Sequence, residues 1–113
     1  MATTANPLFE AQDAPVTQTT VYTAGAGSRV YVDKLTATNT TLVAQTISFN
    51  VVPSGGTVGS SNLLAKTISI APGAFYSFPE IVGHVLAAGD FLSCIASLTG
   101  VTIRASGRVL TAA

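Results

Sequence analysis

The sequence of 113 residues has the length of one domain, and its 48% hydrophobic residues exclude a chain that is disordered throughout. Only 9% of the residues are charged, against roughly 25% in an average domain. The five basic residues balance the five acidic ones. The sequence therefore lacks the basic excess with which nucleic-acid-binding domains contact phosphate, and so few charges favour association with other protein.

The chain divides into a short first segment and one domain. Residues 1–15 contain Pro7 and Pro15 and show neither a helical nor an alternating apolar pattern. They are predicted to form an extended N-terminal arm, with a single domain over residues 16–113. No basic segment followed by an apolar run opens the sequence, so no secretory signal is expected, and no segment has the composition of a membrane helix.

From residue 16 onward, β-branched and aromatic runs alternate with clusters of Gly, Pro, Ser and Asn. This pattern is typical of all-β domains. Strands are predicted at residues 16–23, 29–38, 42–52, 63–70, 75–78, 91–98 and 101–110. Residues 79–86 fit either a strand or one helical turn. The expected fold is a seven- to eight-stranded antiparallel β-sandwich, jelly-roll or Ig-like.

Three details of the strands are predicted from side-chain alternation. The apolar positions of residues 29–38 change parity near Asp33 and Lys34, which indicates a β-bulge. Thr99 and Gly100 have the composition of a two-residue turn joining the last two strands as a hairpin. Two sets of residues are each expected to form the core-facing side of a strand. The first is Val43, Ile47, Phe49 and Val51, and the second is Val101, Ile103, Ala105, Gly107 and Val109.

No catalytic, cofactor or metal site is predicted. His84 is the only histidine, and Glu80, four residues before it, gives at most two metal ligands. Cys94, the only cysteine, lies in an apolar strand and is expected to be a buried thiol. The glycines of residues 25–28 have no following helix to bind phosphate, and no serine lies in a nucleophile-elbow motif. The protein is therefore expected not to be an enzyme.

Partner contacts are predicted at three kinds of position. The arm and the long loop at residues 53–62 are exposed segments that other proteins can contact. Arg104 and Arg108 lie on one face of a strand, where they either pair with carboxylates of a partner or are simply solvated. The predicted contact residues are Leu8, Phe9, Pro53, Ser54, Gly55, Gly56, Tyr76, Arg104 and Arg108.

Three phrases of the sequence resemble a group of known proteins. They are residues 34–40, residues 51–56 with their Pro-Ser-Gly-Gly loop, and the turn at residues 86–90. With these three segments, the chain from residue 16 to residue 109 resembles small β-sandwich structural proteins of tailed bacteriophages. The shared phrases are turn residues rather than catalytic motifs.

The resemblance implies a non-enzymatic virion protein assembled in the host cytoplasm. The first expectation is a capsid decoration or cement protein that binds the major capsid protein as a homo-oligomer. One alternative is a tail or vertex accessory protein that anchors a receptor-binding fibre or spike. Another, from a different class, is a glycan-binding β-sandwich that uses the Gly-rich loops and Tyr76. No nucleic acid, membrane or small-molecule substrate is expected as a partner.

Overall fold

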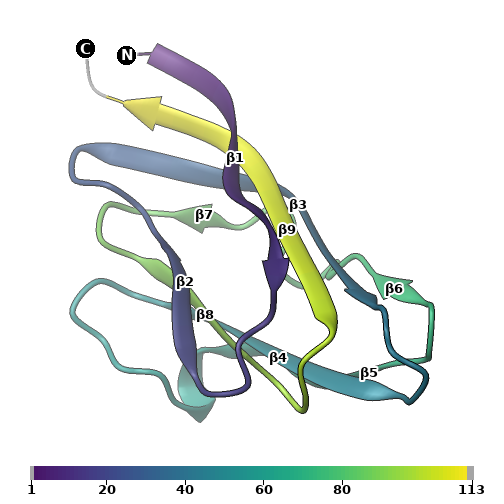
Figure 1. The fold of residues 1–113 in the computed structure, drawn as a ribbon. Coiled ribbons are helices and arrows are strands. Elements are labelled where there is room, and N and C mark those ends of the chain that lie inside the picture. The colour runs from purple at the N-terminus through teal and green to yellow at the C-terminus, as the bar shows by residue number, and fades with distance from the viewer. Residues whose placement is uncertain (1, 112–113) are drawn as a thin grey trace.

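The computed structural model describes residues 2–111, which form two antiparallel sheets packed face to face (Figure 1). The all-β prediction is thus confirmed. The elements are β1 (Ala2–Asp13), β2 (Thr19–Thr23), β3 (Ser28–Asn39), β4 (Gln45–Val52), the short 3-10 helix η1 (Ser60–Asn62), β5 (Leu63–Ile70), β6 (Phe75–Tyr76), β7 (Val85–Leu86), β8 (Phe91–Ala96) and β9 (Val101–Thr111).

The strand order identifies the connectivity. One sheet has the order β1-β9-β3-β6, with β7 also pairing with β3, and the other has the order β2-β8-β4-β5. The first four strands alternate between the two sheets, and so do the last two. Of the two predicted connectivities, this order is that of a jelly roll.

The core lies between the sheets and is made of apolar side chains from both. Phe49 of β4 and Phe78 meet edge to face, with ring centroids 5.0 Å apart. Phe78 is fully buried although its φ is 46°, so its ring holds the segment after β6 against the core in a strained conformation. Other fully buried side chains are Val30, Leu35, Leu86, Leu92, Cys94, Val101 and Ile103.

The turns follow the sequence predictions closely. Ala74 N–H donates to the carbonyl of Ala71, and Gly73 has φ 74°, which is the conformation that the third residue of a type II turn requires. Backbone hydrogen bonds also close the predicted turns at residues 25–28, 53–56 and 87–90. In the last of these, the Asp90 carboxylate accepts hydrogen bonds from Ala87 N–H and Ser54 N–H, both at 2.9 Å.

The predicted bulge in β3 is present. The pairing of β3 with β9 shifts between Val32 and Lys34, so that Asp33 is the extra residue. Because of this shift, Val32 and Leu35 both face the core. Gly107 of β9 lies opposite Val32, where a Cβ atom would be 2.0 Å from the carbonyl oxygen of Tyr31. The bulge therefore needs a residue without a side chain on the neighbouring strand.

Residues 2–13 are a strand instead of the predicted arm. β1 pairs antiparallel with β9 from Ala2–Thr111 to Asp13–Thr102, with two register shifts beyond Pro7. Its sequence shows no alternation because the register changes along the strand, and Pro7 is tolerated because β1 is at a sheet edge. With β1 and the short β7, the described residues contain nine strands rather than seven or eight.

The predicted hairpin of the last two strands is wrong. β8 pairs with β2 and β4, whereas β9 pairs with β1 and β3 in the other sheet. The loop at residues 97–100 therefore crosses between the sheets. The residues of a turn indicate that the chain changes direction there, but they do not indicate which strand becomes the neighbour in the sheet.

The alternation predicted for β4 holds only in part. Ile47 and Phe49 are buried, but Val43 lies in the preceding loop and is exposed. Val51 is partly buried and packs against the core, as predicted, and its neighbour Val52, on the opposite face of the strand, is fully buried as well. The predicted core face of β9 is confirmed, since Val101, Ile103, Ala105 and Gly107 are buried. Val109 is partly buried at its end.

Gly107→Ala is expected to lower the free energy of unfolding by about 2 kcal/mol, because the added methyl group meets backbone rather than a movable side chain. Gly59→Ala is the matched control: its φ is −167° and nothing lies within 4 Å of the added atom. Urea unfolding of both variants measures the difference. Equal stabilities would show that the bulge does not depend on Gly107.

Candidate functional site

β1 is an open edge of its sheet. One side of the strand pairs with β9, and no other strand in the described part of the chain pairs with it. The side chains at residues 3–7 and 10–13 are exposed, and only Glu10 and Asp13 among them are charged. A long edge strand with few charges exposes backbone N–H and C=O groups to which another strand can bind.

The remaining edges are better protected. The far side of β3 is covered by β6, β7 and the segment between them, where Gly83 N–H donates to the carbonyl of Val32 at 2.7 Å. β5 carries Lys66 and an irregular residue, Thr67, with φ 43°. β2 has only five residues. Lysines, irregular residues and short length all hinder edge pairing. β1 is irregular only beyond Pro7, so its regular part, residues 2–6, is the edge most suited to a second chain.

The outer face of the β1-containing sheet holds both predicted arginines, and each has a carboxylate within its own chain. Arg108 Nε and Nη2 donate to the two oxygens of Asp33, each at 3.0 Å, which raises the pKa of Arg108. The guanidinium of Arg108 also stacks over the Tyr31 ring at 5.0 Å. Arg104 lies 3.7 Å from Glu10 of β1 in an exposed pair.

The other predicted contact residues lie in several places. Leu8 and Phe9 are buried in the chain's own core, so little of either side chain faces outward. Pro53, Ser54 and Gly55 are exposed in the turn after β4, and Gly56 is partly exposed. Tyr76 donates a hydrogen bond of 2.8 Å to Glu80 Oε2, which raises the pKa of the tyrosine. These residues do not form one surface, and whether they contact a partner stays a prediction.

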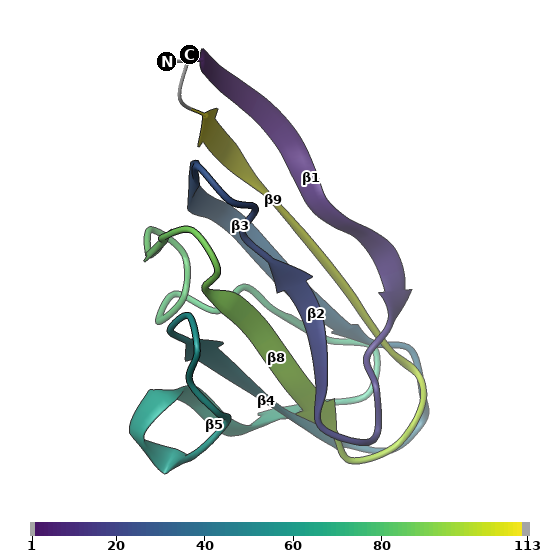
Figure 2. The ribbon, with the colours of Figure 1, turned by 90° about the vertical axis from the view of Figure 1, so that its left-hand side faces the viewer.

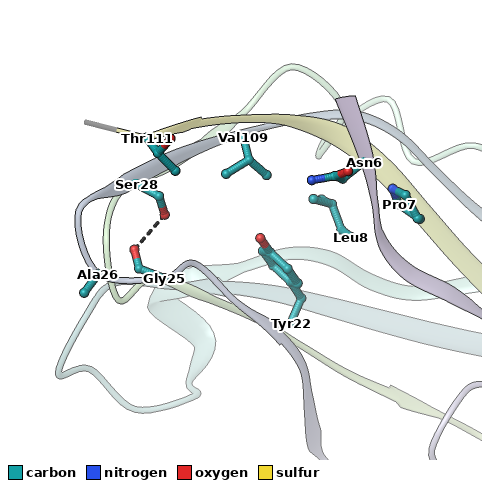
Figure 3. Close-up of a pocket in the computed structure, with 9 residues that line it drawn as sticks. All are labelled: Asn6, Pro7, Leu8, Tyr22, Gly25, Ala26, Ser28, Val109 and Thr111. Carbon is teal, nitrogen blue, oxygen red and sulfur yellow. Dashed lines mark hydrogen bonds between the residues drawn. The ribbon is translucent and has the colours of Figure 1, made fainter. Parts of the chain in front are cut away.

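A groove lies where the β1 sheet extends beyond its partner sheet (Figures 2 and 3). It has a volume of about 500 Å³. Leu8 and Val109 form one wall, and Tyr22 of β2 points its hydroxyl into the space toward Leu8 (Figure 3). None of the lining residues is charged; the others are Asn6, Pro7, Gly25, Ala26, Ser28 and Thr111. No pattern in the sequence indicates the groove, because its walls come from three segments that are distant along the chain.

The described residues contain neither a metal-binding cluster nor a membrane-spanning helix. Within residues 2–111, no group of three or more His, Cys, Asp and Glu side chains is placed to hold a metal ion. No helix in that range has the length and apolarity needed to cross a membrane.

Cys94 is buried in the core, as predicted, in the middle of β8. Its side chain has no exposed surface, and burial raises the pKa of the thiol to about 12. A thiol without exposed surface is inert toward other thiols, because the thiolate is the reactive form. In the folded chain Cys94 is therefore not available for a disulfide with a second copy.

Comparison with known proteins finds a similarity of fold but none of sequence family. No family model and no curated protein matches the sequence. The structure is similar to a solved structure of Bacillus endospore appendages, described as a novel family of disulfide-linked pili. The TM-score is 0.58 at 18% sequence identity, over 98% of this chain and 89% of that chain. At this identity the similarity shows the fold.

This finding corrects the expected function. The structural neighbour is a bacterial appendage and not a phage protein, which overturns the capsid decoration role, the tail or vertex alternative, the virion location and the capsid protein as partner. The phage resemblance rested on turn residues, and a jelly roll needs such turns whatever its function. The neighbour forms pili, which agrees with the more general expectation of self-association.

Folded protein at pH 8 is expected to react with a thiol reagent at least a hundredfold more slowly than the unfolded chain, because the Cys94 thiol is buried and stays protonated well above that pH. Labelling with Ellman's reagent in buffer and in 6 M guanidinium measures the ratio. Rapid labelling of the folded protein would contradict the burial of this thiol.

Proposed function

We propose that this chain is a non-enzymatic structural subunit that assembles with copies of itself into a fibre. The observation that carries the proposal is the open edge of β1, twelve residues long and charged only near its end. The similarity in fold to subunits of an appendage supports it, because it shows that a jelly roll of this kind can serve as a building block of pili. The small number of charges supports it as well, since little charge must be desolvated when copies pack together.

Strand pairing supplies the attraction between copies. In the free molecule the outer N–H and C=O groups of β1 form hydrogen bonds to water. Pairing replaces these with hydrogen bonds to a second strand, which lowers the free energy by about 1 kcal/mol per bond. Two β1 strands running antiparallel extend the sheet from one molecule into the next. The Arg104–Glu10 pair lies beside this edge and neutralises Glu10, so that Asp13, the last residue of β1, carries the remaining charge of the strand.

Assembly of this chain is proposed to be non-covalent, unlike that of the disulfide-linked neighbour. These 113 residues contain one cysteine, and its thiol is buried. Linking copies through Cys94 requires the core to open. The contacts between subunits therefore consist of strand pairing and apolar packing.

The double variant Thr3→Lys with Ala5→Lys is expected to raise the protein concentration needed for self-association at least tenfold. Both residues are exposed on β1, and lysines on an edge oppose pairing with a like-charged edge. Ala88→Lys, on an exposed turn away from β1, is the control. Sedimentation velocity and negative-stain electron microscopy give the readout. Equal association of both variants would show that β1 is not the contact.

Assemblies of the wild-type chain are expected to be unchanged by 10 mM dithiothreitol, because no disulfide joins the subunits. Electron microscopy before and after reduction checks this, with non-reducing gel electrophoresis to detect covalent dimers. Fibres that dissolve on reduction would contradict the non-covalent assembly.

A further inference from the structure

The molecule has an apolar end opposite the groove. Four loops meet there, at residues 14–18, 40–44, 71–74 and 97–100, and they form the lower end of the molecule in Figure 1. Backbone hydrogen bonds connect them: Thr40 N–H donates to Gly100, Gly73 N–H to Asn39, and Ala96 N–H to Pro15. None of the residues in these loops is charged. We call this surface the apolar end.

Exposed hydrophobic side chains gather at the apolar end. Val16, Leu42, Val43 and Leu98 lie in its loops, and Phe75 follows the third loop directly. Leu42 is 95% exposed and Phe75 is 68% exposed. Single exposed apolar residues are common on protein surfaces, but a group of them at one end, without charges among them, indicates an interaction surface.

The loop that carries Leu42 is anchored by hydrogen bonds to Asn39, whose side chain is fully buried. The Asn39 side-chain amide donates to the carbonyls of Val43 at 2.8 Å and Ile70 at 2.9 Å. Its side-chain oxygen accepts from Thr41 N–H at 2.9 Å. These hydrogen bonds hold the loop backbone on both sides of Leu42, so that little backbone entropy remains to be lost on binding.

The groove at the other end has matching properties. Its walls are apolar at Leu8 and Val109, and none of its lining residues is charged. The Tyr22 hydroxyl, which points into the groove, has no hydrogen-bond partner among the described residues, so it is free to bond a backbone carbonyl of an incoming loop (Figure 3). A charged peptide or ligand would find no counter-charge here, whereas an uncharged apolar loop leaves no charge unpaired.

The two surfaces lie at opposite ends of β9. This strand begins at Val101, beside the apolar end, and finishes at Thr111, which lines the groove. The molecule is elongated, with dimensions of 48 × 27 × 19 Å. A contact between the apolar end of one copy and the groove of the next joins two different surfaces, so each added copy presents a free groove or a free apolar end. Such head-to-tail contacts build open chains.

We infer that the apolar end of one copy, led by Leu42, docks into the groove between β1 and β2 of the next copy. This inference rests on the proposed function and supplies its longitudinal contact. Pairing of β1 with β1 joins only two copies, because the contact uses the same edge on both. The head-to-tail contact extends such pairs along the fibre axis.

Disulfide trapping tests the geometry directly. Leu42→Cys protein is mixed with Asn6→Cys protein under mild oxidation. Cys94 does not react because it is buried. Both new thiols are exposed in the single chain, one at the apolar end and one at the groove. The mixture is expected to give a disulfide between residue 42 of one copy and residue 6 of the other, identified by mass spectrometry of peptides. Leu42→Cys alone is expected to give less than a tenth of that yield, whereas Asn6→Cys alone reports 6–6 disulfides that form through the β1 contact.

Each other outcome has a definite meaning. Predominant 42–42 disulfides, or 6–6 disulfides without any 42–6 disulfide, would overturn the head-to-tail contact in favour of a symmetric one. Fibres in electron micrographs without any 42–6 disulfide would overturn the head-to-tail contact but leave the proposed function intact. Neither fibres nor cross-links at millimolar protein would overturn both.

A charge-exchange series gives a second measurement. Leu42→Lys is expected to raise the concentration needed for assembly at least tenfold, because it places an unpaired charge in an uncharged groove. Combining Leu42→Lys with Asn6→Asp is expected to lower this concentration at least threefold relative to Leu42→Lys alone, because Asn6 lines the groove and its replacement supplies a counter-charge. Val82→Lys, on the turn that covers β3, is the control. No effect of Leu42→Lys, or equal effects of Leu42→Lys and Val82→Lys, would overturn the docking.

Discussion

The pairing of β9 with β1 on one side and β3 on the other is the interaction on which the rest of the structure depends. β9 pairs with β3 from Val101, at the apolar end, to Thr111, at the groove, and with β1 from Thr102 to Thr111. It fixes β1 as the edge strand and holds that edge beyond the partner sheet (Figure 2). The close approach of Gly107 to Tyr31 sets the register of this unit, because any larger residue there collides with the bulge of β3.

Four of the ten charged side chains form ion pairs within the molecule. Arg108 binds Asp33 and Arg104 lies beside Glu10, all on the outer face of the β9 sheet. Both pairs are exposed, so they add little to the stability of the fold. Their consequence is electrostatic: the two arginines present no unpaired charge to a partner. The groove and the apolar end have no charge at all, so the surfaces suited to contact are the uncharged ones.

The sequence predicts those parts of the fold that depend on local chemistry. Turns such as residues 71–74 and the bulge at Asp33 follow from residue types and side-chain parity, and both are found. β1 escapes prediction because its strand conformation depends on pairing with β9, about a hundred residues away in the sequence. The exchange of sheets between β8 and β9 is likewise a property of the whole fold.

The candidate surfaces are harder still to predict. The groove combines residues from β1, β2 and β9, and the apolar end combines four loops. Sequence alone shows each of their residues as an ordinary loop or edge position. The predicted contact residues lie mostly elsewhere, and two of them, Leu8 and Phe9, are apolar because they are buried. The resemblance to phage proteins has a similar origin. The segments that carry it are turns, which specify a fold and not a partner.

Non-covalent assembly changes what each contact must achieve. A disulfide holds two subunits however weak the surrounding surface is, but a chain whose only thiol is buried must use several contacts at once. A copy inside the fibre makes the β1 contact and two head-to-tail contacts together, while a copy at an end lacks one of them. Contacts that form together reinforce one another through effective concentration, so individually weak contacts suffice. Such a fibre forms above a threshold concentration and dissolves below it, and this reversibility is the physical property that separates it from a disulfide-linked pilus.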